Sequence, residues 1–298
     1  MRPTRTTNYE IGFNQQLTDY LAFDVTGYYR DVKDQVVFIA QQADERQGFQ
    51  DYYIKANGDF ATTKGIELTL TMRRYQRLAL NGSISFQDAR GTGSFPGSNR
   101  GIVGSPLVPG QPYVPKYISP LDFNRDLTAN LNIDYRFGEN DGPAFLNNFG
   151  VSVLLKYEAG RPFTRGQGDP DQIGDSQPNS GDARFRTAIE PLNASLMPST
   201  FQVDLRIEKS FNIFDRLSAN VYVFVINLFD TKNVNNVFLA TGSADDNGYV
   251  TNPTYIADKQ KLYGGDSFAD LYRAMNITNA DFLYDAPRQI RFGIRLEY

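Results

Sequence analysis

The last strand-like segment of the chain is the feature that most constrains its fold. From Ile290 to Tyr298 every second residue is apolar, and the positions between them hold arginine, glycine and glutamate. Successive side chains of a β-strand point to opposite faces, so this pattern predicts a strand with one apolar face and one charged face. The apolar face would meet a second sheet in a soluble β-sandwich, or lipid in an outer-membrane barrel whose charged face lines a wet lumen.

The same alternation recurs upstream, and it predicts about nine strands in all. The other alternating segments are residues 9–13, 21–39, 66–72, 78–86, 127–137, 149–157, 201–207 and 217–225. Aromatic residues cluster at the strand ends, and every segment keeps one polar face, which favours the barrel over the sandwich.

The predicted connections alternate between short turns and long segments rich in Gly, Pro and polar residues. Outer-membrane barrels have short periplasmic turns and long extracellular loops, so this alternation supports the barrel. Inside the last long connection, residues 267–275 are predicted to form one short helix. The predicted long connections are residues 41–59, with Asn57-Gly58-Asp59 as a turn signal, 91–120, 159–199 and 230–285.

Composition excludes several classes of protein. The chain has 298 residues, is 41% hydrophobic and has a mean hydropathy of −0.44. It contains no apolar run of the ~20 residues that a transmembrane helix needs, which leaves a β-barrel possible. The 18 Tyr and 22 Phe suit aromatic girdles at two lipid–water interfaces.

The absent residue types narrow the chemistry. The chain has no Cys and no His, so thiol and histidine-based catalysis are excluded, and we expect no enzyme activity. A net charge of −4 gives no reason to expect nucleic-acid binding. The first seven residues are polar and do not resemble a signal peptide, so the sequence predicts either a soluble chain or a piece of something longer.

Four stretches, in this order and spacing, resemble the second half of the barrel of TonB-dependent outer-membrane receptors. The insertion that begins near residue 230 is similar to receptors of Bacteroidetes-type bacteria. The four stretches are Asn8-Tyr9-Glu10-Ile11-Gly12-Phe13, Lys64-Gly65-Ile66-Glu67-Leu68, Asn227-Leu228-Phe229-Asp230 and the segment from Pro287 to Tyr298.

The resemblance implies an all-β, antiparallel transmembrane β-barrel of 22 strands with an N-terminal plug, of which residues 1–298 would supply the C-terminal part. The plug domain, the energy-coupling segment and roughly the first thirteen strands have no counterpart here. The energy-coupling inner-membrane complex would therefore be reached only through that missing N-terminal part.

The implied function is ligand-gated uptake of a scarce nutrient at the bacterial cell outer membrane, with this chain supplying barrel wall and extracellular loops. The alternative is a structural or adhesin-like barrel protein that does not transport. Expected partners are outer-membrane lipid, the barrel-insertion machinery and a small-molecule, sugar or peptide ligand. The sequence does not identify the substrate, a partner lipoprotein or the oligomeric state.

Candidate ligand contacts lie in the predicted loops, where aromatic faces and arginine forks suit sugars, peptides or anionic chelates. Phe292, Leu296 and Tyr298 resemble the C-terminal signal that the barrel-insertion machinery reads. We expect no cofactor and no metal site, because the acidic clusters at residues 169–175 and 245–247 lack the spacing of a calcium loop. The candidate ligand residues are Arg100, Tyr113, Tyr117, Arg161, Phe163 and Arg165.

Overall fold

The computed structural model of the chain describes most of the strands and the bases of the connections. The described residues are 1–41, 52–95, 118–166, 189–214, 217–246, 248, 257, 261, 270, 271, 274 and 283–297, with side chains omitted at 38–41, 52, 53 and 297.

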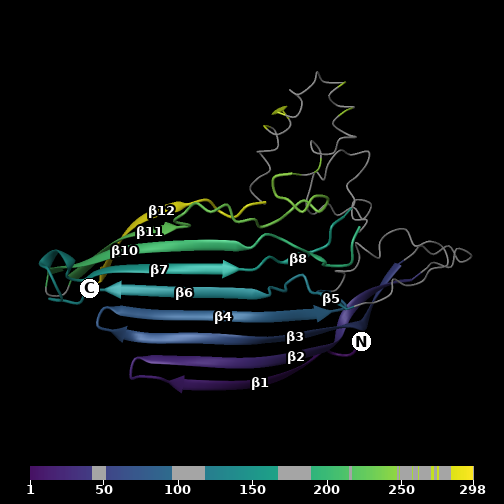
Figure 1. Ribbon diagram of the computed structural model, residues 1–298, viewed down its shortest axis with the longest axis horizontal. Coiled ribbons are helices and arrows are strands. Elements are labelled where there is room, and N and C mark those ends of the chain that lie inside the picture. Colours follow the sequence, from purple (N-terminus) through teal and green to yellow (C-terminus); the bar gives the residue numbers. More distant parts are fainter. Residues whose placement is uncertain are drawn as a thin grey trace, which may run out of the picture.

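The described part is dominated by one antiparallel sheet in which nine long strands follow one another in chain order (Figure 1). Each strand pairs with the next, so the sheet is a continuous meander without crossovers. The strands are β1 (Arg5–Gln16), β2 (Leu21–Gln41), β3 (Tyr52–Tyr75), β4 (Leu78–Gly91), β6 (Leu127–Arg136), β7 (Phe149–Glu158), β10 (Thr200–Phe214), β11 (Leu217–Ile226) and β12 (Gln289–Glu297).

Short elements fill some of the connections. Strand β5 (Ser119–Pro120) extends the pairing of β4, and β8 (Pro162–Phe163) pairs with β9 (Ser195–Leu196) in a separate two-stranded ladder. A 3₁₀ turn, η2 (Ala144–Leu146), lies between β6 and β7. No helix among the described residues is long and apolar enough to cross a membrane.

The cross-strand pairing places apolar residues of one strand opposite apolar residues of the next, so each face of the sheet is continuous from strand to strand. Phe23 lies opposite Leu70, and Leu131 lies opposite Leu155, which in turn lies opposite Val203. Many large apolar side chains on this face are exposed, because no second layer covers it in the described part of the chain. An uncovered apolar face of this extent matches the lipid-facing surface of an outer-membrane barrel.

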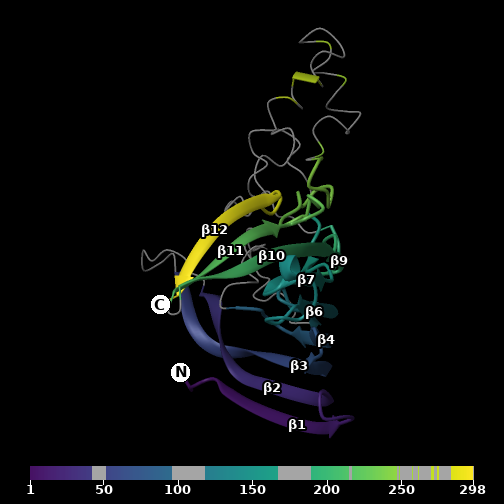
Figure 2. The ribbon, with the colours of Figure 1, turned by 90° about the vertical axis from the view of Figure 1, so that its left-hand side faces the viewer.

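The sheet is curved across its width like a segment of a barrel wall (Figure 2). In Figure 1 the short turns gather at the same end as the C-terminus, and the long connections leave from the end where the N-terminus lies. The prediction of an antiparallel sheet with one apolar face is therefore confirmed. The alternation of short and long connections fails between β2 and β3, because their ten-residue connection (42–51) is shorter than the twelve residues between β6 and β7 (137–148).

One predicted boundary is wrong. Residues 41–59 were expected to form a connection with a turn at Asn57, but β3 begins at Tyr52 and pairs with β2 from there. The register between the two strands shifts near Gln35, next to Asp34, which has a positive φ of 59°. The amide of Asn57 donates to the backbone oxygens of Asp34 and Arg2 at 2.6 and 2.8 Å, so a turn-forming residue is held inside a β-bulge instead.

The ends of β3 and β4 at the long-connection side carry a small apolar cluster. Ala61, Ala89 and Leu121 are buried there, and Val32 packs against them. The side-chain oxygen of Asn124 accepts the backbone N–H of Ala89 at 2.8 Å, which replaces a strand partner at the end of the ladder.

The predicted helix at residues 267–275 lies largely outside the described residues. Asp270, Leu271 and Ala274, which are described, have helical backbone.

Candidate functional site

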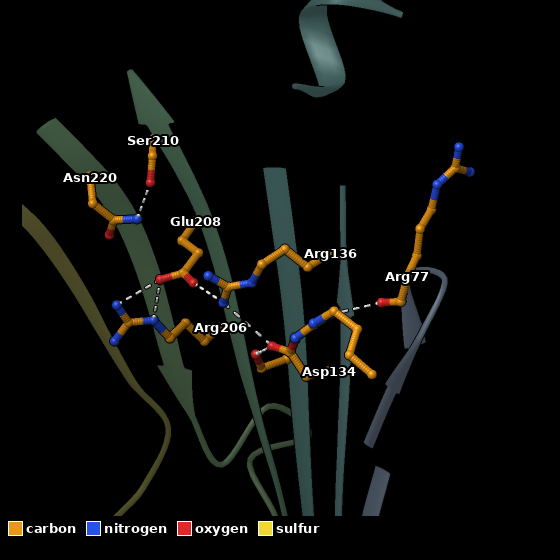
Figure 3. Close-up of polar contacts among 9 residues, drawn as sticks. Arg77, Asp134, Arg136, Arg206, Glu208, Ser210 and Asn220 are labelled. Carbon is orange, nitrogen blue, oxygen red and sulfur yellow. Dashed lines mark hydrogen bonds and ion pairs between the residues drawn. The ribbon is translucent and has the colours of Figure 1, made fainter. Parts of the chain in front are cut away.

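A chain of charged side chains crosses the polar face of the sheet at the short-turn end (Figure 3). Arg74 of β3 contacts Asp134 of β6, and Arg136 of β6 contacts both Asp134, at 3.5 Å, and Glu208 of β10. Arg206 donates to Glu208 through Nε at 2.9 Å and Nη2 at 2.8 Å. Two of these contacts join strands separated by an intervening strand, as side chains converging on the inner face of a curved sheet would.

Two glycines let side chains lie flat on this face. A Cβ at Gly293 would lie only 2.3 Å from the ring of Tyr222, and a Cβ at Gly150 would lie 3.3 Å from the guanidinium of Arg136. The guanidinium carbon of Arg206 lies 4.2 Å from the centre of the Tyr222 ring, a cation–π geometry. The ring of Tyr222 therefore contacts Gly293 on one neighbouring strand and Arg206 on the other. Its contact with the guanidinium fixes the orientation in which Arg206 donates to Glu208.

The carboxylates of this network lie deeper than the cations that contact them. The side chain of Glu208 is 9% exposed and that of Asp134 is 18% exposed, whereas those of Arg136 and Arg206 are 43% and 36% exposed. The ion pair of Lys156 and Asp204, which lies nearer the long-connection end, shows the same difference in exposure: Asp204 is buried and Lys156 is half-exposed. The wall therefore presents mainly its cations to whatever occupies the space in front of it.

The candidate ligand residues of the β7–β10 connection contact the neighbouring connection. Arg161 donates through Nη2 to the backbone oxygen of Asn235 at 3.1 Å, and Arg165 does so to that of Ala240 at 3.1 Å. Phe163 is buried within β8. The structure thus brings these three residues together at the base of two connections, while Arg100, Tyr113 and Tyr117 lie outside the described residues.

Asn193 is a buried residue at this end of the sheet that the sequence analysis did not single out. Its side-chain nitrogen donates to the backbone oxygen of Pro120 at 2.8 Å and to the carboxylate of Asp122 at 2.7 Å. Its backbone N–H donates to the hydroxyl of Thr164 at 2.8 Å. Asn193 therefore ties the β7–β10 connection to the β4–β6 connection, and no periodic pattern could have identified it.

The base of the long β11–β12 connection is closed by its own small core. Val234 forms a β-bridge with Tyr284, and the hydroxyl of Tyr284 donates to the carboxylate of Asp245. Burial, followed by the hydrogen bond and charge of Asp245, raises the pKa of Tyr284 to about 12. The buried members of this core are Phe238, Ala244 and Leu283.

Two of the three predicted assembly-signal residues are described. Phe292 and Leu296 of β12 are 78% and 63% exposed on the apolar face, and Tyr298 lies outside the described residues. The described part of the chain contains no group of three or more carboxylates arranged to hold a metal ion.

Comparison with solved structures shows the fold. The chain is similar to Pseudomonas aeruginosa FpvA bound to a heterologous pyoverdine and to the FrpB iron transporter from Neisseria meningitidis, with TM-scores of 0.54 and 0.52. Sequence identity is 14% in both comparisons, and 99% of this chain is covered. The chain spans only 27% of the first structure and 31% of the second, so it matches less than a third of either protein.

Comparison with protein-family models assigns the chain to a family. No curated protein matches it. Residues 1–234 match the family described as TonB dependent receptor-like, beta-barrel, whose members are non-enzymatic transporters of the outer membrane. That match covers most of the chain and agrees with the meander and with its apolar outer face. The chain therefore belongs to the TonB-dependent receptor β-barrel family.

Proposed function

We propose that the chain is the C-terminal part of the barrel of a TonB-dependent uptake receptor, and that it supplies wall and extracellular loops. The observation that carries the proposal is the two-faced meander, in which one face is apolar along the middle of the strands and the other holds a network of ion pairs. A sheet of this kind separates lipid from a polar lumen, which is what a receptor that passes a nutrient across the outer membrane requires.

The loops would provide the selectivity for the nutrient. The two arginines of the β7–β10 connection, Arg161 and Arg165, bind backbone oxygens and so shape the mouth, while Phe163 packs beneath it. In this proposal they position the loops that carry the ligand contacts. One of the two similar structures binds a pyoverdine and the other transports iron, but 14% identity does not transfer either ligand to this chain.

The orientation of the wall is tested with single cysteines introduced into a cysteine-free form of the complete protein, to which residues 1–298 contribute no native cysteine. In the complete protein carrying this chain, Ile189→Cys lies at the long-connection end and Glu139→Cys lies in the β6–β7 turn. A membrane-impermeant maleimide should label Ile189→Cys on intact cells and Glu139→Cys only after the outer membrane is opened. Labelling of Glu139→Cys on intact cells would contradict the proposed orientation.

Uptake is tested by growth on a panel of single scarce nutrients that includes ferric chelates, oligosaccharides and peptides. A strain lacking the gene should fail on at least one of them, and the restored gene should rescue growth only when the energy-coupling inner-membrane complex is intact. Equal growth of the two strains across the panel, with surface adhesion lost instead, would favour the adhesin-like alternative.

The assembly role proposed for the end of β12 has its own test. Deleting Tyr298 should lower the amount of folded protein in the outer membrane, since an aromatic residue at an apolar position of the final alternating segment resembles the signal for barrel insertion. Unchanged outer-membrane levels would show that Phe292 and Leu296 suffice or that the signal lies elsewhere.

A further inference from the structure

On the polar face of strands β3 to β12, arginines outnumber the carboxylates that they contact. We call this region the arginine wall and define it by Arg74, Arg136, Arg206 and Arg291. Arg206 lies opposite Phe224, which lies opposite Arg291, so these two arginines share one row of the sheet. The four guanidinium groups and the two carboxylates of Asp134 and Glu208 leave a surplus of two positive charges, and the neighbouring Lys156–Asp204 ion pair adds no net charge.

The two carboxylates are fully engaged within the wall. One oxygen of Asp134 contacts Arg74, and the other accepts from Ser152 at 2.5 Å and contacts Arg136. The two oxygens of Glu208 are divided between Arg136 and Arg206. Each carboxylate oxygen therefore already has a donor within the wall, and both carboxylates lie beneath the cations.

The arginines keep donor capacity on their outer side. Both carboxylate contacts of Arg136 use the same nitrogen, Nη2. Arg206 uses Nε and Nη2, and its plane is fixed by the ring of Tyr222. Arg291 donates to Gln289 at 2.8 Å on its own strand. A guanidinium has five N–H donors in a planar fork that matches carboxylate and phosphate groups.

We propose that the arginine wall is a transit surface for solutes that carry carboxylate or phosphate groups. The inference rests on the proposed uptake function and narrows its substrate class to anions. Each guanidinium is partly solvated and already neutralised in part by the wall, so it offers a weak, readily exchanged contact. Weak contacts spread over several strands suit passage of a small anion better than permanent docking of an acidic protein segment.

The experiment measures the local potential with a reporter cysteine in the complete protein carrying this chain. Asn132, the position of the reporter variant Asn132→Cys, is exposed on the polar face of β6, two residues before Asp134. Ser83→Cys is the matched control, because it lies on the same face between Thr69 and Asn130, with no charged residue opposite it. The reagents are the anionic sulfonatoethyl and the cationic trimethylammonioethyl methanethiosulfonate.

The ratio of the two rates cancels differences in thiol ionisation, since both reagents attack the same thiolate. A surface potential of one to several kT should make the anionic-to-cationic ratio roughly tenfold higher at Asn132→Cys than at Ser83→Cys. Adding Arg74→Gln, which removes the cation paired with Asp134, should lower the ratio, and Arg90→Gln on the outer face should leave it unchanged. Citrate, used as a trianionic probe, should slow modification at Asn132→Cys, whereas the neutral sugar raffinose should not.

Equal ratios at the two cysteines would overturn the inference, and so would a high ratio without protection by citrate. If neither reagent reached Asn132→Cys while Ser83→Cys was labelled, the wall would be covered by protein and the solute path would be wrong. Loss of nutrient uptake would leave these rates unaffected, so failure of the proposed function and failure of this inference give different results.

Discussion

Gly293 is the position at which a single added side chain tests the packing of the wall most directly. A Cβ there would lie 2.3 Å from Cζ of Tyr222 and 2.4 Å from its hydroxyl oxygen. The backbone of β12 is held by its ladder to β11, so the ring must swing away. Moving the ring also removes the support beneath Arg206.

The expected cost of Gly293→Val follows from three contributions. Overpacking costs about 1–3 kcal/mol, and loss of the cation–π contact costs about 0.5–1 kcal/mol at an exposed site. Replacing a strand glycine recovers about 0.5–1 kcal/mol of backbone entropy. The free energy of unfolding should therefore fall by about 1–3 kcal/mol.

The assay is urea unfolding of the complete protein in lipid vesicles, followed by the shift in electrophoretic mobility that accompanies loss of the folded barrel. Gly27→Val is the control, because a Cβ at Gly27 meets nothing closer than 3.8 Å, and it should be neutral or slightly stabilising. Tyr222→Ser combined with Gly293→Val should cost less than the sum of the two single changes, since the clash exists only when both larger side chains are present.

Equal destabilisation by Gly27→Val and Gly293→Val would refute this reasoning, and so would strict additivity of the two changes in the double variant.

The contact of Tyr222 with Gly293 also bears on the register between β11 and β12, because these strands are joined by a segment of some sixty residues, residues 227–288. Hairpin register is normally fixed by the turn, and so long a connection cannot fix it. Tyr28 lies over Gly65 in the same way between β2 and β3, which are also joined by a connection longer than a hairpin turn.

Three further predictions test other parts of the structure. Leu131→Arg on the apolar face should cost about 2–4 kcal/mol of folding free energy in lipid vesicles, whereas Asn132→Arg on the polar face should cost far less. Asn193→Ala should cost about 1–3 kcal/mol locally, by leaving buried partners unsatisfied, and limited proteolysis should then cut the loop bases faster while the barrel stays folded. The raised pKa of Tyr284 means that its contribution to stability is complete below pH 10 and is lost as the pH rises through about 12. A tyrosine absorbance titration should lose its highest-pH component in Tyr284→Phe, and retention of that component would contradict the contact with Asp245.

The sequence predicted the strands well because each has period-two alternation over its full membrane-spanning length. It failed where a non-local contact overrides a local signal. Asn57 precedes a glycine and reads as a turn, yet its amide is held by backbone oxygens of Asp34 and Arg2. The short strands β5, β8 and β9 have two residues each, which is too few for any periodicity to register.

The candidate site shows the same division. Alternation placed Asp134, Arg136, Arg206 and Glu208 on one face, but it could not show that Arg136 reaches past β7 to Glu208, because that contact depends on the curvature of the whole sheet.

Arginines that look alike in the sequence act differently at the two ends of the wall. Arg161 and Arg165 donate to backbone oxygens of a neighbouring connection, so their charges are used to join loops. Arg136 and Arg206 hold carboxylates that lie beneath them, so their charges remain directed away from the sheet. Neutralising the loop arginines should therefore loosen the mouth and leave the potential of the lumen unchanged. Neutralising those of the wall should change the potential while the mouth keeps its shape, and this contrast separates positioning of the loops from contact with a passing solute.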